Sequence, residues 1–268
     1  MSSWIWRRRV GPAAAILGLG AAQALAQSTT PPALSTDEII ARHIAARGGL
    51  AALKAIKTLR MTGTLRISGL DAQLGYEEDI ARPDSVRINA TLQGLTAVQA
   101  YNGETGWQIQ PFQGRKDPET LSGDDAKSLQ EEADFEDPLI DAKNKGATID
   151  NLGLKDVDGG PAYALRATLR NGDQQTFYLD PDAWLAFRVE TRQVLRGSEQ
   201  ITVTDLGDYE KIEGVYFPLE QSSGPKDQPA QQTITYTKID VNPPLASSQF
   251  AMPAGAKTPA PTASEDKK

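Results

Sequence analysis

Apolar and polar residues alternate along the chain between residues 59 and 110. The first run places Leu59, Met61, Gly63, Leu65 and Ile67 on one side of an extended chain, with polar residues on the other side. A second run covers residues 86–92, and weaker runs cover residues 74–80 and 97–101. A period of two residues is typical of strands with one buried and one solvated face. Turn pairs such as Asn102-Gly103 separate the runs, so the pattern predicts an antiparallel meander.

The alternation returns in the second half of the chain. Residues 163–169 form the clearest run, and Asn171-Gly172 then marks a tight hairpin. Further strands are predicted at residues 175–179, 185–189, 201–203, 215–217 and 234–236. Residues 111–123, between the two groups of strands, are polar without alternation and predict a loop.

Helical signals occur in two places. Ser35 and Glu38 form a capping box at the start of one helix, and a second short helix is predicted over residues 50–57. Residues 122–134 are acidic but carry apolar residues at helical spacing, which predicts an inserted amphipathic helix. We therefore expect a mainly β (α+β) fold. Its strongly curved antiparallel sheet forms an incomplete barrel, with the N-terminal helices and the inserted helix covering its concave face.

The first 26 residues have the features of a secretory signal peptide. Arginines at positions 7–9 precede a short apolar run, and Ala24-Leu25-Ala26 fits the small-residue rule for cleavage after Ala26. A retained anchor helix is the alternative, and the arginines leave the twin-arginine route open beside the Sec route. The other predicted segments are a linker over residues 27–36, one domain over residues 37–252 and a disordered tail over residues 253–268.

Charge and cysteine content narrow the possible roles. The chain has no cysteine, so disulfides, thiol catalysis and an acylated N-terminal cysteine are excluded. Its net charge is −7, and it becomes −10 if the three arginines leave with the signal peptide. An acidic chain without a basic cluster repels phosphate backbones, so we expect no nucleic-acid partner.

Few residues are suited to catalysis. His43 is the only histidine, and without cysteine it has no second soft ligand with which to share a metal ion. No G-x-S-x-G elbow or phosphate-binding glycine motif is present. Glu77 and Asp79 share one face of a predicted strand, opposite to Glu78, which leaves a hydrolase of envelope glycans as an alternative. We predict no enzyme activity, no cofactor and no metal site.

The apolar face of the sheet is the main candidate for a site. If a helix covers a concave sheet imperfectly, a dry cavity remains that accepts an acyl chain. Each buried methylene then contributes about 0.8 kcal/mol without any catalytic group. The candidate lining residues are Met61, Leu65, Ile67, Val86, Ile88, Trp107, Leu129, Phe177 and Phe187. The alternative is that these residues form a solid core.

Several short motifs resemble the LolA-type outer-membrane lipoprotein carriers. The segment Arg82-Pro83-Asp84-Ser85-Val86-Arg87 is similar to the R-P-x-x-x-R turn and strand of that family, and the hairpin at residues 101–107 is similar to its hairpin with a tryptophan. The order of elements, with Pro138-Leu139-Ile140 in the helical insertion, also fits these carriers, and residues 44–49, 178–181 and 214–218 are similar to the broader LolA/LolB-like group. The resemblance spans roughly residues 37–253.

The resemblance implies a half-barrel with helices over an apolar cavity and no catalysis. It implies a periplasmic carrier that binds lipoprotein acyl chains or another lipid and moves them toward the outer membrane. Its partners would be an inner-membrane transporter and an outer-membrane receptor, and we expect a monomer. A periplasmic sensor or regulatory protein of the same fold remains an alternative.

Overall fold

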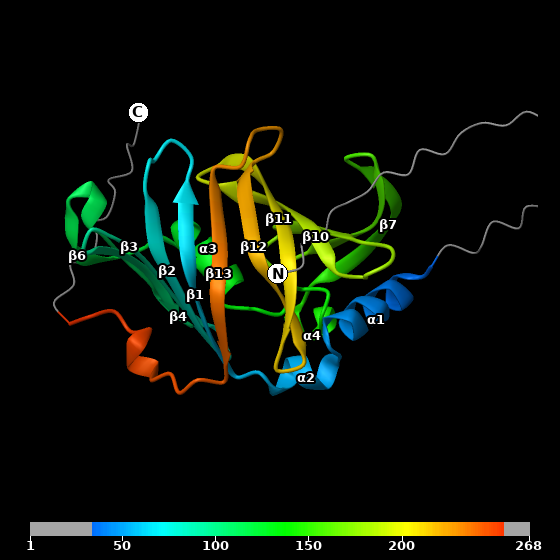
Figure 1. Cartoon of the computed structure of the whole chain (residues 1–268), viewed down its shortest axis with the longest axis horizontal. Coiled ribbons are helices and arrows are strands. Elements are labelled where there is room, and N and C mark those ends of the chain that lie inside the picture. Colours follow the sequence, from blue (N-terminus) through cyan, green and yellow to red (C-terminus); the bar gives the residue numbers. More distant parts are fainter. Residues whose placement is uncertain (1–33, 255–268) are drawn as a thin grey trace, which may run out of the picture. The chain divides into compact units, whose positions relative to one another are not determined.

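The computed structural model describes residues 34–254, which form one antiparallel sheet of thirteen strands (Figure 1). The strand order is β6-β5-β4-β3-β2-β1-β13-β12-β11-β10-β9-β8-β7, and the sheet does not close on itself. This confirms the prediction of a mainly β, incomplete barrel. The predicted signal peptide and most of the predicted linker and tail lie outside the described residues. Among residues 34–254, no helix has the length and apolar character needed to cross a bilayer.

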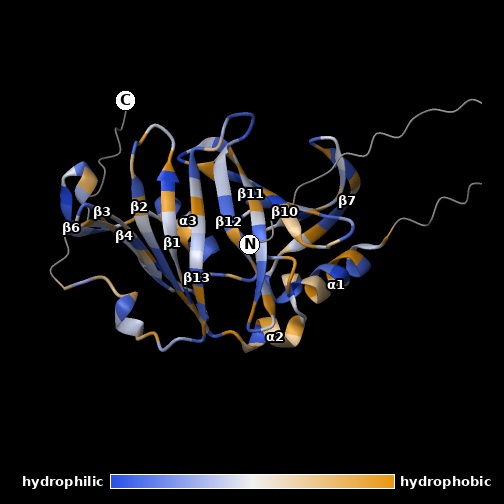
Figure 2. Cartoon of the chain, in the orientation of Figure 1, coloured by the Kyte–Doolittle hydropathy of each residue, from blue (hydrophilic) through white to orange (hydrophobic). Residues whose placement is uncertain are grey.

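The sheet consists of two meanders that meet where β1 pairs with β13. The first contains β1 (Thr58–Ile67), β2 (Gln73–Ala81), β3 (Ser85–Leu92), β4 (Leu95–Asn102), β5 (Gly106–Gln110) and β6 (Arg115–Thr120). The second contains β7 (Thr148–Val157), β8 (Gly160–Thr168), β9 (Gln174–Leu179), β10 (Ala186–Leu195), β11 (Ser198–Ile212), β12 (Val215–Pro225) and β13 (Gln232–Val241). Apolar and polar residues alternate along these strands, as the sequence predicted (Figure 2).

The edge strand β6 was not predicted. β6 lies within residues 111–123, which were expected to form a loop. It is an edge strand that pairs only with β5, and no residue in it is buried. A strand that is solvated on both faces needs no apolar alternation, so periodicity could not reveal it. The short 3₁₀ turn η1 (Pro111–Gln113) precedes it.

Within residues 34–254, four α-helices lie before the first meander and between the two meanders. α1 (Thr36–Arg47) begins at the predicted capping box, in which Glu38 and Ser35 bond each other's backbone N–H groups. α2 (Leu50–Ala55) follows it, and α3 (Gly123–Glu132) is the inserted helix. α3 contacts β3, β4 and β5, whereas α1 contacts β7 and β12. The fourth helix is the single turn α4 (Ala142–Lys145).

Two glycines allow close backbone approaches. A Cβ atom on Gly48 would lie 2.2 Å from the carbonyl oxygen of Gly214, so the end of α1 can reach the β11–β12 turn only without a side chain. In β1, a Cβ atom on Gly63 would lie 2.1 Å from the carbonyl oxygen of Thr235 at the register shift with β13. Larger residues at either position would force these elements apart.

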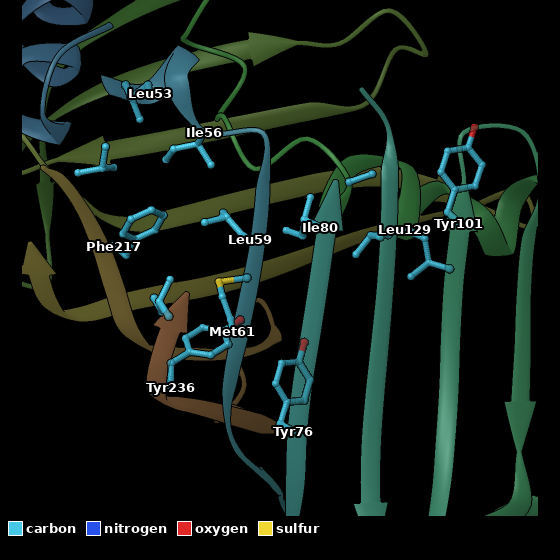
Figure 3. Close-up of a cluster of buried hydrophobic side chains, with 14 of the residues drawn as sticks. Leu53, Ile56, Leu59, Met61, Tyr76, Ile80, Tyr101, Leu129, Phe217 and Tyr236 are labelled. Atoms are coloured by element: carbon cyan, nitrogen blue, oxygen red, sulfur yellow. The ribbon is translucent and has the colours of Figure 1, made fainter. Parts of the chain in front are cut away.

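The buried apolar residues form two main clusters and one small cluster. The largest lies on the concave side and joins α2, α3, β1–β4, β12 and β13 (Figure 3). A second joins Ile39 of α1 and Leu139 to β8, β9 and β10. The third surrounds Trp107, whose Nε1 donates to the carbonyl oxygen of Phe250 at 2.8 Å. Residues near the C-terminus, including the 3₁₀ turn η2 (Ser247–Gln249), therefore cover the face of β4 and β5 opposite α3.

Candidate functional site

A cavity of about 640 Å³ lies on the concave side of the sheet. We call it the concave cavity. Its wall is formed by strands β1, β2 and β9–β12, and the end of α3 with the following loop closes it from the other side. The apolar lining residues are Leu59, Met61, Ile80, Phe135, Pro138, Ala147, Leu169, Phe177, Ala186, Val189, Leu206, Phe217 and Pro218. The wall is therefore largely apolar, whereas the end of α3 is acidic.

Two consecutive glutamates at the end of α3 line the concave cavity. Glu131 accepts hydrogen bonds from the side-chain amides of Gln175 at 2.9 Å and Gln193 at 2.8 Å. Glu132 is surrounded by protein but keeps accessible surface. Burial raises the pKa of both carboxyl groups.

Glu132 is hydrogen-bonded to Glu78, which lies on the concave face of β2 and is fully buried. Oε2 of Glu78 accepts from the hydroxyl of Tyr76 at 3.1 Å and from that of Tyr236 at 2.9 Å. The two rings come from strands on either side of β1, with centroids 6.0 Å apart (Figure 3). Gly63 of β1 pairs with both tyrosines in the ladder.

The surroundings of Glu78 favour its protonated form. Burial raises its pKa well above 4.5, and the neighbouring charge of Glu132 raises it further. Two ionised carboxylates have no hydrogen to share, and Oε1 of Glu78 has no donor among the described residues. When Glu78 is protonated, its carboxyl group can donate the hydrogen bond to Glu132. We call the two carboxyl groups the Glu78–Glu132 pair.

Glu78→Gln is expected to make the protein less sensitive to alkaline pH. The folded-state pKa of Glu78 lies above its unfolded value of 4.5, so its contribution to stability is complete below that value and falls as pH rises above it. Glutamine cannot ionise, and its amide can donate to Glu132 as the protonated carboxyl does. Urea unfolding at about pH 5 and about pH 8 should show a smaller loss of unfolding free energy in the variant. An equal loss in both proteins would contradict the assignment of the proton.

The loop after α3 is held by two buried acidic residues, Glu136 and Asp137, which we call the loop anchor. The carboxylate of Glu136 has no exposed surface and binds Arg82, Lys54 at 3.1 Å and Lys145 at 3.8 Å. Arg82 also donates to the carbonyl oxygens of Ile56 at 2.7 Å and Leu53 at 3.3 Å. The arginine of the R-P-x-x-x-R motif thus connects α2, the β2–β3 turn and the loop.

Asp137 forms the other half of the loop anchor. Its Oδ2 lies 3.0 Å from both Nε2 of His43 and Nη1 of Arg47. Burial alone would raise the pKa of Asp137, but the hydrogen bond from His43 and the charges of His43 and Arg47 lower it to about 2. Nδ1 of His43 faces the carbonyl oxygen of Trp184 at 2.8 Å, so both ring nitrogens face acceptors. His43 thus links the loop to the backbone of Trp184.

The predicted lining residues fall in several places. Met61 and Phe177 line the concave cavity. Leu65, Val86, Ile88 and Leu129 belong to or pack against the large core cluster beside it. Ile67 is 40% exposed at the end of β1, and Phe187 lies at the β10 bulge outside the cavity lining. Ligand binding by Met61 and Phe177 stays a prediction.

The placement of Trp107 needs correction. Its neighbour Gly106 faces α3, because a Cβ atom there would lie 2.8 Å from Cβ of Ala126. Side chains alternate along a strand, so Trp107 points to the other face, where it meets Phe250. It therefore lies away from the concave cavity.

The carboxylates on β2 are not arranged as the glycan-hydrolase alternative requires. Asp79 is held by two hydrogen bonds of 2.7 Å from Arg60, and Glu77 accepts one from Asn89. The inward carboxylate is instead Glu78. The sequence carried a signal for it, since Glu78 shares its strand face with the apolar residues Leu74 and Ile80. Its partner Glu132 carried none, because acidic residues are common in that segment.

Solved structures of three bacterial proteins have a similar fold. A structure described as an outer membrane lipoprotein-sorting protein domain, from Vibrio parahaemolyticus, matches with a TM-score of 0.55 and 10% identity over 81% of this chain and 97% of that chain. A DUF1329 family protein from Desulfovibrio piger matches with a TM-score of 0.56 and 12% identity, over 81% and 97%. A LolA superfamily protein from Nitrosomonas europaea matches with a TM-score of 0.54 and 11% identity, over 82% and 98%.

The sequence itself matches no family model and no curated protein. The likeness is therefore one of fold, and it extends over almost the whole of each solved structure. The chain has the LolA-like fold that its sequence motifs indicated.

Proposed function

We propose that the protein is an exported periplasmic carrier that binds the acyl chains of a lipoprotein or another lipid in the concave cavity. The observation that carries this proposal is the cavity itself. Its volume of about 640 Å³ lies within the range of about 300–1,000 Å³ that is usual for small-molecule sites. Its wall combines side chains from six strands, so it is part of the fold and not a surface irregularity.

The apolar wall suits a hydrocarbon chain. Each methylene transferred from water into such a wall contributes about 0.8 kcal/mol, which corresponds to about fourfold in affinity. Binding of this kind needs no catalytic group. The fold likeness to proteins described by lipoprotein sorting and the signal-peptide features of residues 1–26 support the same role. In that role the carrier passes its cargo from an inner-membrane transporter to an outer-membrane receptor.

Filling the concave cavity is expected to weaken binding of a fluorescent fatty-acid analogue. Val189 lines the cavity from β10, so Val189→Trp would occupy space needed by the chain. We expect a loss of about tenfold in affinity, as for one to two methylenes that no longer fit. Fluorescence titration of the delipidated protein measures the change.

Val194→Trp is the matched control. Val194 lies on the same strand but is 51% exposed and outside the cavity, so the same substitution should leave affinity unchanged. Equal affinity in Val189→Trp and the parent protein would place the binding site elsewhere. Failure of the parent protein to bind any chain would overturn the proposed function.

A further inference from the structure

One basic residue at the border of the concave cavity has no partner for its charge. Arg170 lines the cavity from the hairpin between β8 and β9, and its side chain forms no ion pair or hydrogen bond within residues 34–254. The other two basic lining residues are engaged, because Nη1 of Arg47 lies 3.0 Å from Asp137 and Nζ of Lys145 lies 2.6 Å from Asp134. Within this part of the chain, Arg170 is therefore the lining cation that is free to bind a ligand.

The position of Arg170 is fixed by its hairpin and by the glycine beside it. The N–H group of Leu169 donates to the carbonyl oxygen of Asp173 at 2.8 Å, and Nδ2 of Asn171 donates to the carboxylate of Asp173 at 2.8 Å. The arginine stem lies against Gly146, the C-cap of α4, since its Cβ, Cδ and Nε come within 4.0 Å of the point that a Cβ atom on Gly146 would occupy. Arg170 is nevertheless exposed as a residue, so a ligand can approach it.

The acidic residues that line the cavity do not neutralise this arginine. Asp134, Glu136 and Asp137 are bound to other basic residues. Glu131 accepts from two side-chain amides, and burial raises the pKa of Glu131 and of Glu132, which favours their uncharged forms. None of these acidic residues forms an ion pair with the arginine, so its charge remains available to an anion.

We propose that the concave cavity binds a single-chain amphiphile with an anionic head group, with its hydrocarbon chain along the apolar wall and its carboxylate or phosphate on Arg170. This inference rests on the proposed function and names the class of its ligand. A guanidinium group presents its N–H donors as a planar fork that matches both kinds of anion. Leu169 and Ala147 are apolar lining residues next in sequence to Arg170 and Gly146, so the charge and the apolar wall adjoin.

The size of the cavity favours one chain. Its volume of about 640 Å³ lies within the range of about 300–1,000 Å³ in which sites bury a drug-sized ligand, and one long hydrocarbon chain is a ligand of that size. A lipid with two or three chains would leave hydrocarbon outside the wall, and each methylene left in water forgoes about fourfold in affinity. An alkyl ammonium head group would bring a like charge to the arginine, which disfavours it.

Chain-matched probes test the inference. Dodecanoate, dodecyl phosphate and dodecanol share one chain length and differ only in the head group. Isothermal titration calorimetry near neutral pH should show that the anions bind about fivefold more tightly than the alcohol, which is the upper end for an ion pair open to solvent. A preference for only one of the two anions would identify the head group as a carboxylate or as a phosphate. Native mass spectrometry with excess dodecanoate should show one bound chain per protein.

Three variants assign the preference to the arginine. Arg170→Gln should remove the preference for the anions, while the affinity for dodecanol changes by less than about twofold. Arg170→Lys keeps the charge but not the planar fork, so it should bind dodecanoate more tightly than Arg170→Gln does. Lys143→Gln is the control for loss of one positive charge, because Lys143 is exposed on α4 and lies outside the cavity lining. It should keep the full preference.

The results distinguish this inference from the carrier proposal. If the parent protein binds both anions no more tightly than the alcohol, or if Arg170→Gln keeps the full preference, the inference is overturned while the carrier proposal stands. Binding of two or more dodecanoate molecules would likewise overturn the assignment of a single-chain ligand. If no probe with a dodecyl chain binds, both proposals fall.

Discussion

Replacing Arg82 with alanine is expected to lower the free energy of unfolding by about 3 kcal/mol, because a buried carboxylate then loses its closest cation. Glu136 has no exposed surface, and Arg82 is its partner at the shortest distance. Lys54 and Lys145 remain nearby, which keeps the loss at the lower end of the range for broken buried pairs. The substitution also leaves the carbonyl oxygens of Ile56 and Leu53 without the donor that Arg82 provides. Urea unfolding followed by circular dichroism measures the effect.

Arg192→Ala is the comparison for this experiment. Arg192 pairs with Glu199 at 2.9 Å, but both side chains are about half exposed. Exposed ion pairs of this kind contribute at most about 1 kcal/mol, so the loss should be much smaller than for Arg82→Ala. Equal losses in the two variants would show that the loop anchor contributes no more than a surface pair.

The loop anchor also affects the cavity, because the same loop carries a lining residue. Phe135 lies next to Glu136 and contributes to the cavity, and the guanidinium of Arg82 lies 4.5 Å from the centre of its ring. A loosened loop would therefore change the cavity border as well as stability. This connects a motif first recognised as a turn and strand to the proposed binding site.

The sequence predicted the fold well because the strongest signals are local. The period of two along β1 and the capping box at Ser35 each depend on a few neighbouring residues, and tertiary packing agrees with them. It predicted the cavity poorly. β4 and β5 have apolar residues on both faces, since residues near the C-terminus cover the second face, and alternation cannot tell which face meets the helices. Trp107 was misplaced for this reason.

The acidic residues of the site were missed for a different reason. Glu78 is a polar residue on a buried face, and such residues often mark function because burying a charge is costly. The pattern showed its position but not its partners, which come from α3, β2 and β13. The loop anchor likewise brings together residues about 90 positions apart, such as Arg47 and Asp137. Pairings at this separation depend on how the loop packs against α1 in the folded chain, which local periodicity does not reveal.

Asp137→Asn is expected to reduce stability at neutral pH and to have little effect in acid. Asp137 has a folded-state pKa of about 2 and an ordinary value of 3.8, so the unfolded chain takes up a proton first as pH falls. Its contribution is therefore complete above about pH 5 and is lost between about pH 4 and about pH 2. The difference between the two pKa values corresponds to about 2 kcal/mol. Asparagine keeps the size of the side chain but has no charge for His43 and Arg47.

Unfolding free energies of the parent protein and Asp137→Asn should thus differ by about 2 kcal/mol at about pH 6 and converge near pH 2. Asp182→Asn is the matched control, because Asp182 is exposed and its side chain forms no ion pair among residues 34–254. Its difference from the parent should be small at both pH values. A difference for Asp137→Asn that stays constant with pH would mean that the aspartate acts through shape and hydrogen bonding alone. Convergence in acid would instead show that its charge, placed beside His43 and Arg47, holds the loop against α1.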